Sequence, residues 1–147
     1  AVGIVGRQGR PYPPGRARIN GQRTLATVAG PFVLTWAHRD RVLQDDQLVD
    51  DDAGSIGPAP ATRYGVRVLD AAATPLLTRT DIAGSTATVA VDVSGPLTVE
   101  LWALDDVGDS IQRHRWTFDH AAAPGTPGIE APTWTPVVVI IDGNDPP

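Results

Sequence analysis

Short stretches in which apolar and polar residues alternate are the feature that most constrains the fold of this chain. Six of them, separated by turn-forming residues, cover 32–36, 64–68, 75–80, 87–93, 97–103 and 114–118, and the run at 75–80 is the weakest. Successive side chains of a strand point to opposite faces, so this alternation predicts strands that bury one face and expose the other. Several such strands at short spacing predict an all-β fold, an antiparallel two-sheet sandwich.

The alternation also predicts which side chains form the core. The inward set consists of Phe32, Leu34, Trp36, Tyr64, Val66, Val68, Leu97, Val99, Leu101, Ala103, His114, Trp116 and Phe118. A further strand is expected over residues 15–20, with Ala17 and Ile19 on one face and a turn at Asn20-Gly21. Turns are also expected at 81–85 and at Gly95-Pro96, because glycine and proline interrupt strands.

The chain divides into four segments by composition. Residues 1–14 predict an extended basic arm, 15–120 the sandwich, 121–136 a linker rich in Pro, Gly and Ala, and 137–147 a C-terminal strand. Val137, Val139 and Ile141 belong to a β-branched run that is apolar on both faces, so it is expected to dock on another element or chain. The chain is expected to be part of a longer polypeptide. The sequence has no run long and apolar enough for a membrane helix, so membrane insertion is not expected.

Charge is distributed unevenly along the chain. Residues 1–39 carry six arginines and no acid, whereas residues 40–147 carry six arginines and all seventeen acids, a net charge of −11. This asymmetry predicts that a basic arm, with Arg7 and Arg10, lies against an acidic surface of its own chain or of a neighbour. The acidic loop at 45–52, with Asp50, Asp51 and Asp52, is the expected counterpart. Nucleic acid is a poor partner for a net acidic chain.

The residues that could take part in catalysis or metal binding are better interpreted as structural or surface residues. The absence of cysteine excludes thiolate chemistry and disulfides. His38, His114 and His120 are too widely spaced for a typical zinc site and are read as structural or surface histidines. His38 and Asp40 suggest an acid–base pair, but no nucleophile motif accompanies them, so Asp40 is expected to pair with an arginine in solvent. Neither a catalytic residue nor a cofactor is predicted.

Two acidic segments raise the question of calcium. The loop at 45–52 offers oxygen ligands at short spacing but lacks the glycine and terminal glutamate of a calcium loop. Residues 142–145 read Asp-Gly-Asn-Asp, similar to the calcium-binding linker of cadherin-like repeats, without the other ligand motifs of that family. For the loop at 45–52 the preferred interpretation is an acidic loop that is solvated or docked on a partner. The sequence does not decide whether either segment binds calcium.

Trp102 and Leu104 alternate onto the outward side of the strand at 97–103, and Trp134 lies in the linker. Exposed tryptophans anchor protein partners or stack on sugars. Isolated domains seldom leave large apolar patches open, so cover by the chain's own C-terminal extension or by a sister subunit is expected.

The order of these features resembles a fibronectin type III domain. A proline-rich lead-in precedes the first strand, Trp36 lies in the second, and Tyr64 begins the third. The run 97–110 resembles the sixth strand and its hairpin, with Leu97 or Val99 in place of the family's usual tyrosine. The resemblance implies a fibronectin type III or immunoglobulin-like sandwich.

A narrower resemblance is to the fibronectin-type domain of tail-tip or baseplate proteins of tailed bacteriophages and prophages. It is carried, in this order, by residues 12–15, 18–21, 35–41, 46–48, 55–58 and 114–119. The resemblance implies a non-enzymatic virion protein, in the tail and in the host cytoplasm during assembly. Its implied partners are other tail proteins, identical subunits in a ring and a host cell-surface receptor. A carbohydrate- or receptor-binding module and an accessory domain of a secreted bacterial enzyme remain as alternatives.

Overall fold

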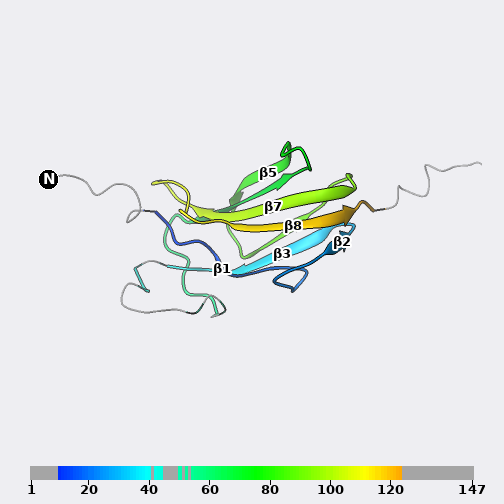
Figure 1. Ribbon diagram of the computed structural model, residues 1–147. Helices are drawn as coiled ribbons and strands as arrows, with labels where there is room; N and C mark the ends of the chain where they lie inside the picture. Colours follow the sequence, from blue (N-terminus) through cyan, green and yellow to red (C-terminus); the bar gives the residue numbers. More distant parts are fainter. Residues whose placement is uncertain (1–9, 41, 45–49, 51, 53, 124–147) are drawn as a thin grey trace, which may run out of the picture.

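The computed structural model describes residues 10–40, 42–44, 50, 52 and 54–123. Strands dominate this part of the chain (Figure 1): β1 Gly15–Ile19, β2 Thr27–Ala29, β3 Phe32–Ala37, β4 Arg63–Leu69, β5 Pro75–Ile82, β6 Thr86–Val89, β7 Gly95–Leu104 and β8 His114–Ala121. The predicted all-β class is confirmed. The described residues include no helix able to span a bilayer.

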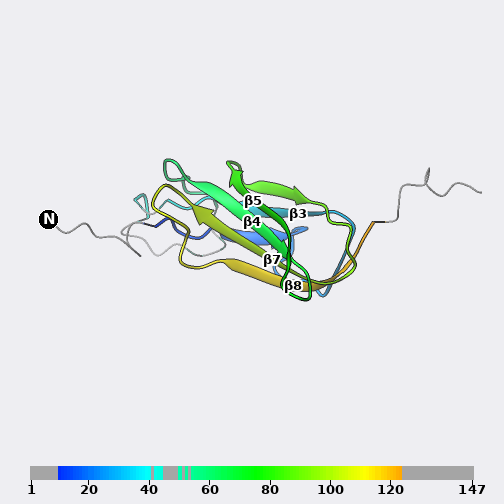
Figure 2. The same ribbon diagram turned by 90° about the horizontal axis from the view of Figure 1, so that it is seen from above.

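The strands form two sheets that pack face to face. One sheet has the order β1-β3-β6, and the other has the order β2-β8-β7-β4-β5. Figure 2 shows β4, β7 and β8 side by side over β3 of the other layer. Neighbouring strands are antiparallel except for β2, which runs parallel to the end of β8. The predicted antiparallel two-sheet sandwich is therefore confirmed.

The core lies between the sheets and contains the predicted inward residues. Phe32, Leu34, Tyr64, Val66 and Leu101 are all at most 1% exposed. Two aromatic contacts join the layers: Phe32 meets Phe118 edge-on at 5.5 Å between ring centroids, and Trp36 lies 5.2 Å from Tyr64. His114 differs from the expected inward set, because it is half-buried and stacks on Trp116.

The Asn20-Gly21 turn is confirmed by its hydrogen bonds. The main-chain N–H of Ile19 donates to the Gln22 carbonyl and that of Gln22 donates to the Ile19 carbonyl, both at 2.9 Å. Asn20 and Gly21 have φ values of 49° and 79°. Asn and Gly tolerate this left-handed backbone best, which explains why this pair closes the turn.

Three expectations about element limits were wrong. Gly95 and Pro96 belong to β7, where they pair with His120 and Asp119, rather than forming a turn before it. The strand expected over 87–93 ends at Val89, because its partner β3 begins at Phe32, opposite Val89. The turn expected at 81–85 begins two residues later, since Asp81 and Ile82 still belong to β5. Sequence alternation also missed β2, whose three residues are too few to show a period.

The described chain begins and ends at opposite ends of β8. Near its start, Arg10 donates through Nη1 to the Asp109 carbonyl at 3.3 Å, and the Pro14 carbonyl contacts His114 Nε2 at the first residue of β8. Past the last residue of β8, the Ala122 N–H donates to Ser94 Oγ at 2.9 Å. The two ends are thus separated by the length of this strand (Figure 1).

Candidate functional site

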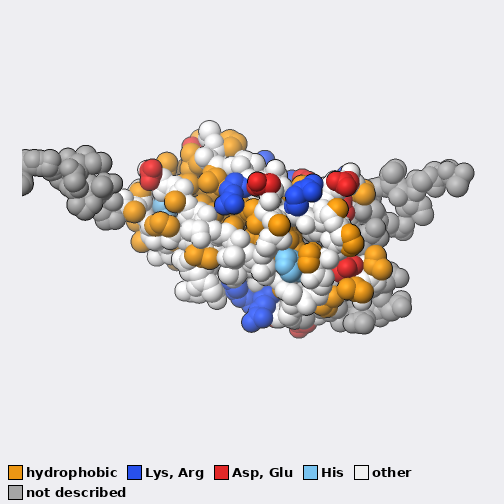
Figure 3. Space-filling view, turned by 180° about the vertical axis from the view of Figure 1, so that it is seen from behind, with side chains coloured by type: hydrophobic (Ala, Val, Ile, Leu, Met, Phe, Trp, Pro, Cys, Tyr) orange, Lys and Arg blue, Asp and Glu red, His pale blue; other side chains and the backbone are white. Residues whose placement is uncertain are grey.

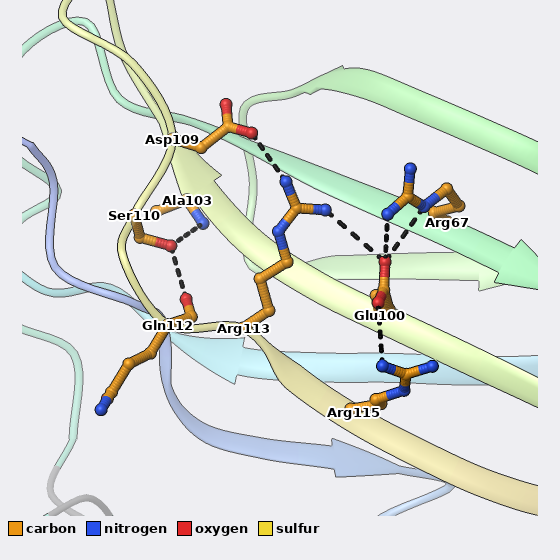
Figure 4. A network of polar contacts seen from close by, with 8 residues as sticks. All are labelled: Arg67, Glu100, Ala103, Asp109, Ser110, Gln112, Arg113 and Arg115. Atoms are coloured by element: carbon orange, nitrogen blue, oxygen red, sulfur yellow. Dashed lines mark hydrogen bonds and ion pairs between the residues drawn. The ribbon is translucent and has the colours of Figure 1, made fainter.

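A cluster of arginines surrounds one glutamate on the outer face of the five-stranded sheet. Strand register places Arg67 of β4 and Arg115 of β8 directly opposite Glu100 of β7. Arg67 donates to Glu100 Oε1 through Nη2 at 2.6 Å and Nε at 3.0 Å. Arg113 Nη1 lies 3.5 Å from the same oxygen, and Arg115 Nη1 lies 3.7 Å from Oε2. Figure 4 shows the guanidinium groups converging on Glu100 from three sides.

The cluster keeps a surplus of positive charge at the surface. The Glu100 side chain is 9% exposed, whereas that of Arg115 is 62% exposed. Arg113 also pairs with Asp109, at 2.8 Å from Nη2 to Oδ2. Two carboxylates therefore face three guanidinium groups, whose fixed planar donors suit further carboxylates. The more exposed pair of Arg113 with Asp109 contributes only about 0–1 kcal/mol to stability.

Trp102 lies beside this cluster on the outer face, as the alternation predicted. It is only 4% exposed among the described residues, because the Arg113 guanidinium stacks 4.1 Å from its ring centroid and that of Arg67 lies 5.9 Å away. Gly65 stands opposite it and leaves room for the indole. Arg67 of β4 and Arg113 of the β7–β8 loop thus cover Trp102, so its burial needs neither the C-terminal extension, which lies outside the described residues, nor a sister subunit. Leu104, further along β7, is partly exposed.

The loop between β7 and β8 is held by its own polar side chains. Asp105 Oδ1 accepts hydrogen bonds from the N–H groups of Val107 and Gly108. Ser110 Oγ accepts from the Ala103 N–H at 3.2 Å and donates to the Gln112 carbonyl at 2.8 Å. This loop positions Asp109 beside Arg113 and Arg113 beside Glu100, so it builds one side of the arginine cluster (Figure 4).

A second charged contact links the acidic loop to the basic N-terminal region of the same chain. Asp52 lies 2.6 Å from Arg18 Nη2 and 2.7 Å from Arg23 Nη2. The hydrogen bond from Arg18 is the main reason that the pKa of Asp52 is lowered. Arg18 and Arg23 lie beyond the predicted arm, residues 1–14. Within that arm Arg10 contacts the Asp109 carbonyl and Arg7 lies outside the described residues, so docking of the arm on the acidic loop stays a prediction. Asp50 lies nearby, with its carbonyl accepting from Arg39 at 3.3 Å.

His38 and Asp40 have different partners and form no described acid–base pair. His38 Nδ1 lies 2.7 Å from the Tyr64 hydroxyl, and burial lowers the pKa of His38, which favours the neutral ring as acceptor. Asp40 Oδ1 accepts hydrogen bonds from the N–H groups of Val42 and Leu43. Asp40 is 6% exposed, so the expected solvent-exposed pairing is wrong: its carboxylate is buried and closes a turn.

The three histidines lie in separate surroundings. His120 is buried, with Nδ1 at 2.6 Å from the Val93 carbonyl and Nε2 at 2.8 Å from the Gly30 carbonyl. Within the described residues, no group of three His, Asp or Glu side chains is arranged to hold a metal ion. His120 is a structural link from β8 to the segments that precede β7 and β3, in keeping with the structural role expected for it.

A groove runs along the first half of β8, between this strand, β1 and residues 23–25. Its volume is about 310 Å³, and Arg18, Arg23 and Arg115 stand on its rim. Trp116 Nε1 donates to the Arg23 carbonyl at 2.9 Å and fixes the segment that forms the far wall. No local sequence pattern indicates this groove, because it depends on which strands become neighbours.

Several predicted partner-binding residues lie outside the described residues. They are Arg7, Asp51, Trp134, Val137, Val139 and Ile141. The predicted linker and C-terminal strand, and the acidic residues 142–145, lie there as well, apart from Ala121 to Ala123. Arg10, Asp50, Asp52, Trp102 and Leu104 are described, and they belong to different parts of the surface rather than to one site.

Comparison with known proteins gives matches in structure only. No family model and no curated protein matches the chain. Among solved structures, FN3tt is 11% identical with a TM-score of 0.44, and the match covers 76% of this chain and 96% of that one. The FN1-FN3 domains of chicken CNTN1 are 12% identical with a TM-score of 0.43, covering 77% of this chain and 35% of that one.

A third match is an extracellular domain from B. thetaiotaomicron, assigned to a hybrid two component system. It is 10% identical with a TM-score of 0.47, and the match covers 80% of this chain and 16% of that one. The strand order of this chain is the evidence for its fold type. Apart from the short β2, one sheet contains β1, β3 and β6, and it faces a second sheet of β4, β5, β7 and β8. The fold is a fibronectin type III-like sandwich.

Proposed function

We propose that this sandwich is a non-enzymatic spacer and protein-docking unit in the distal tail of a tailed bacteriophage. The observation that carries the spacer role is the placement of the two chain ends. Arg10 contacts the loop before β8, whereas Ala122 contacts Ser94 beyond the far end of β8. A domain whose two connections leave at opposite ends adds its own length between whatever precedes and follows it.

The surface supports the docking role. Figure 3 shows arginine and acidic side chains interspersed over one face rather than gathered by sign. Interspersed charges favour partners with a matching pattern, because like charges that meet at an interface are penalised. The Glu100 cluster holds Arg67 and Arg113 in fixed positions, so a partner would lose little side-chain entropy in meeting them.

The assignment to a phage tail rests on the ordered sequence motifs between residues 11 and 120. It brings with it the proposed partners: other tail proteins, identical subunits in a ring and a host surface receptor. Its proposed location is the virion, after assembly in the host cytoplasm. The assignment is separate from the spacer role, which depends on geometry alone.

Immunogold electron microscopy tests the tail assignment. An antibody against residues 10–123 is applied to particles released from a bacterial culture that carries the coding sequence. Label at the end of the tail opposite the head is the expected result. The parent protein in particle-free culture fluid would instead indicate an accessory domain of a secreted enzyme, and selective binding on a glycan array would indicate a carbohydrate-binding module.

A further inference from the structure

The first half of β8 has an open hydrogen-bonding edge. β2 pairs only with Asp119, His120 and Ala121, at the end of the strand. The Asp119 N–H donates to the Ala26 carbonyl, and the Ala121 carbonyl accepts from Gly30, so odd-numbered residues direct their main-chain groups away from β7. Main-chain groups alternate in direction along a strand. Those of Arg115 and Thr117 therefore point to the same open side, where the described residues supply no hydrogen-bond partner.

This open edge lines the groove beside β8. Arg115 and Thr117 form one wall, while residues 23–25 form the other. The Trp116 indole holds the Arg23 carbonyl and keeps this far wall in place. β2 demonstrates that the same edge of β8 accepts a parallel strand at residues 119–121. An extended segment in the groove would continue the sheet where β2 leaves it.

The charges on the rim indicate what kind of segment fits. Three arginines, Arg18, Arg23 and Arg115, belong to the groove lining. Arg18 and Arg23 already hold the Asp52 carboxylate between them, so the geometry of this pair suits a carboxylate. The Arg115 side chain is 62% exposed, and its Nη1 lies 3.7 Å from Glu100 Oε2, beyond hydrogen-bond distance. Its guanidinium group is therefore able to reorient toward a carboxylate of a partner.

We propose that an extended acidic segment of a partner protein adds as a strand to the open edge of β8 at Arg115–Thr117. Its main chain would bond to the two residues that face away from β7, and its carboxylates would meet Arg115, Arg23 and Arg18. Strand addition of this kind obtains affinity from main-chain bonds and specificity from alternate side chains. The inference deepens the proposed docking role and does not depend on the phage assignment.

The test uses a capped hexapeptide that alternates glutamate and valine, titrated into the full chain and followed by NMR. We expect the amides of Arg115 and Thr117 to exchange at least ten-fold more slowly at saturation. We also expect Arg115→Glu to weaken binding at least ten-fold. Arg79→Glu, the same charge change on the exposed surface of β5 at the opposite edge of this sheet, should leave it unchanged. Asp52→Asn should strengthen binding, because it frees Arg18 and Arg23.

Two peptide controls separate strand addition from simple charge attraction. Replacing glutamate by lysine should abolish binding, and N-methylation of alternate peptide amides should abolish it without changing the charge. Binding that survives N-methylation, or that is equal in the Arg115→Glu and Arg79→Glu variants, would overturn the proposal. A dimer that forms without peptide and protects the same amides would assign the edge to a second copy instead, and would overturn it too. None of these outcomes affects the electron microscopy of the tail.

Discussion

At the scale of single residues, Gly65 and Trp102 depend on each other. They face one another across β4 and β7, and a β-carbon on Gly65 would lie 2.3 Å from an indole carbon of Trp102. The absence of a side chain at 65 lets the indole lie flat against the sheet, beneath the Arg113 guanidinium. This pair explains why a tryptophan on an outward-facing position is not exposed.

Gly65→Ala should therefore destabilise the domain by about 1–3 kcal/mol, the usual cost of overpacking. Chemical denaturation measures the change, with Gly84→Ala as the control, since nothing lies within 4 Å of a β-carbon there. Trp102→Leu should relieve the clash. In a double-mutant cycle, the loss of stability in the double variant should therefore be smaller than the sum of the two single losses by at least about 0.5 kcal/mol. Additive effects of the two substitutions would contradict this account.

Tyr64 gives the protein a predicted sensitivity to alkali. Burial raises the pKa of Tyr64 to about 12, whereas tyrosine in an unfolded chain titrates near 10. Between these values the unfolded state releases a proton that the folded state retains. The free energy of unfolding should therefore fall by about 2–3 kcal/mol as pH rises from about 10 to about 12.

Urea denaturation at several pH values checks this prediction with two variants. Tyr64→Phe should lower stability at neutral pH, because the hydrogen bond to His38 is lost, and should remove most of the fall above pH 10. Tyr12→Phe should keep the fall, because Tyr12 is 41% exposed. A fall of equal size in the wild type and in Tyr64→Phe would show that another group titrates.

At the scale of strands, alternation in the sequence was a sound guide wherever a strand buries one face. The runs at 32–36 and 114–118 show this best, since Phe32, Leu34, Trp36, Trp116 and Phe118 are buried while the residues between them are exposed. In the run at 97–103 the outward residues Glu100 and Trp102 are buried as well. The three residues of β2 bury only Val28, which leaves no period to detect. The end of β6 depends on where β3 begins, a fact of pairing that no local pattern contains.

The two faces of β3 provide a direct test of inward and outward assignment. Trp36→Ala should destabilise the domain by about 3–5 kcal/mol, because it opens a cavity beside Tyr64. Val33 lies on the opposite face and is 38% exposed. Val33→Ala should cost well under about 1 kcal/mol, the full span of β-propensity differences. Thermal and urea denaturation measure both. A loss below about 1 kcal/mol for Trp36→Ala would refute its place in the core.

At the scale of the whole molecule, the fold class was predictable but the surface was not. Alternating runs indicate two sheets, but they do not indicate that β8 lies between β7 and β2. The arginine cluster around Glu100 and the groove beside β8 both depend on that order. The acidic loop illustrates the same limit: its charge was evident, but its contact with Arg18 and Arg23 needed the folded chain.

The opposite placement of the chain ends predicts a fixed spacing that spin labels can measure. The sequence has no cysteine, so Gln112→Cys with Ala123→Cys labels only the chosen sites. A strand rises about 3.3 Å per residue, so these positions should lie about 30 Å apart or more, with a narrow distribution. Ser94→Cys with Ala123→Cys lies at one end and should give a much shorter distance. A broad distribution for the first pair would contradict a rigid spacer.

The placement of the ends also decides how the domain meets mechanical force. Tension applied through Pro14 and Ala122 acts along the axis of β8, in the direction that slides it past β7. The inter-strand hydrogen bonds of an antiparallel pair lie perpendicular to the strands, so such a pull loads the whole β7–β8 ladder at once rather than opening it one bond at a time. We therefore expect a domain loaded along this axis to resist stretching more than one whose end strand is peeled off bond by bond.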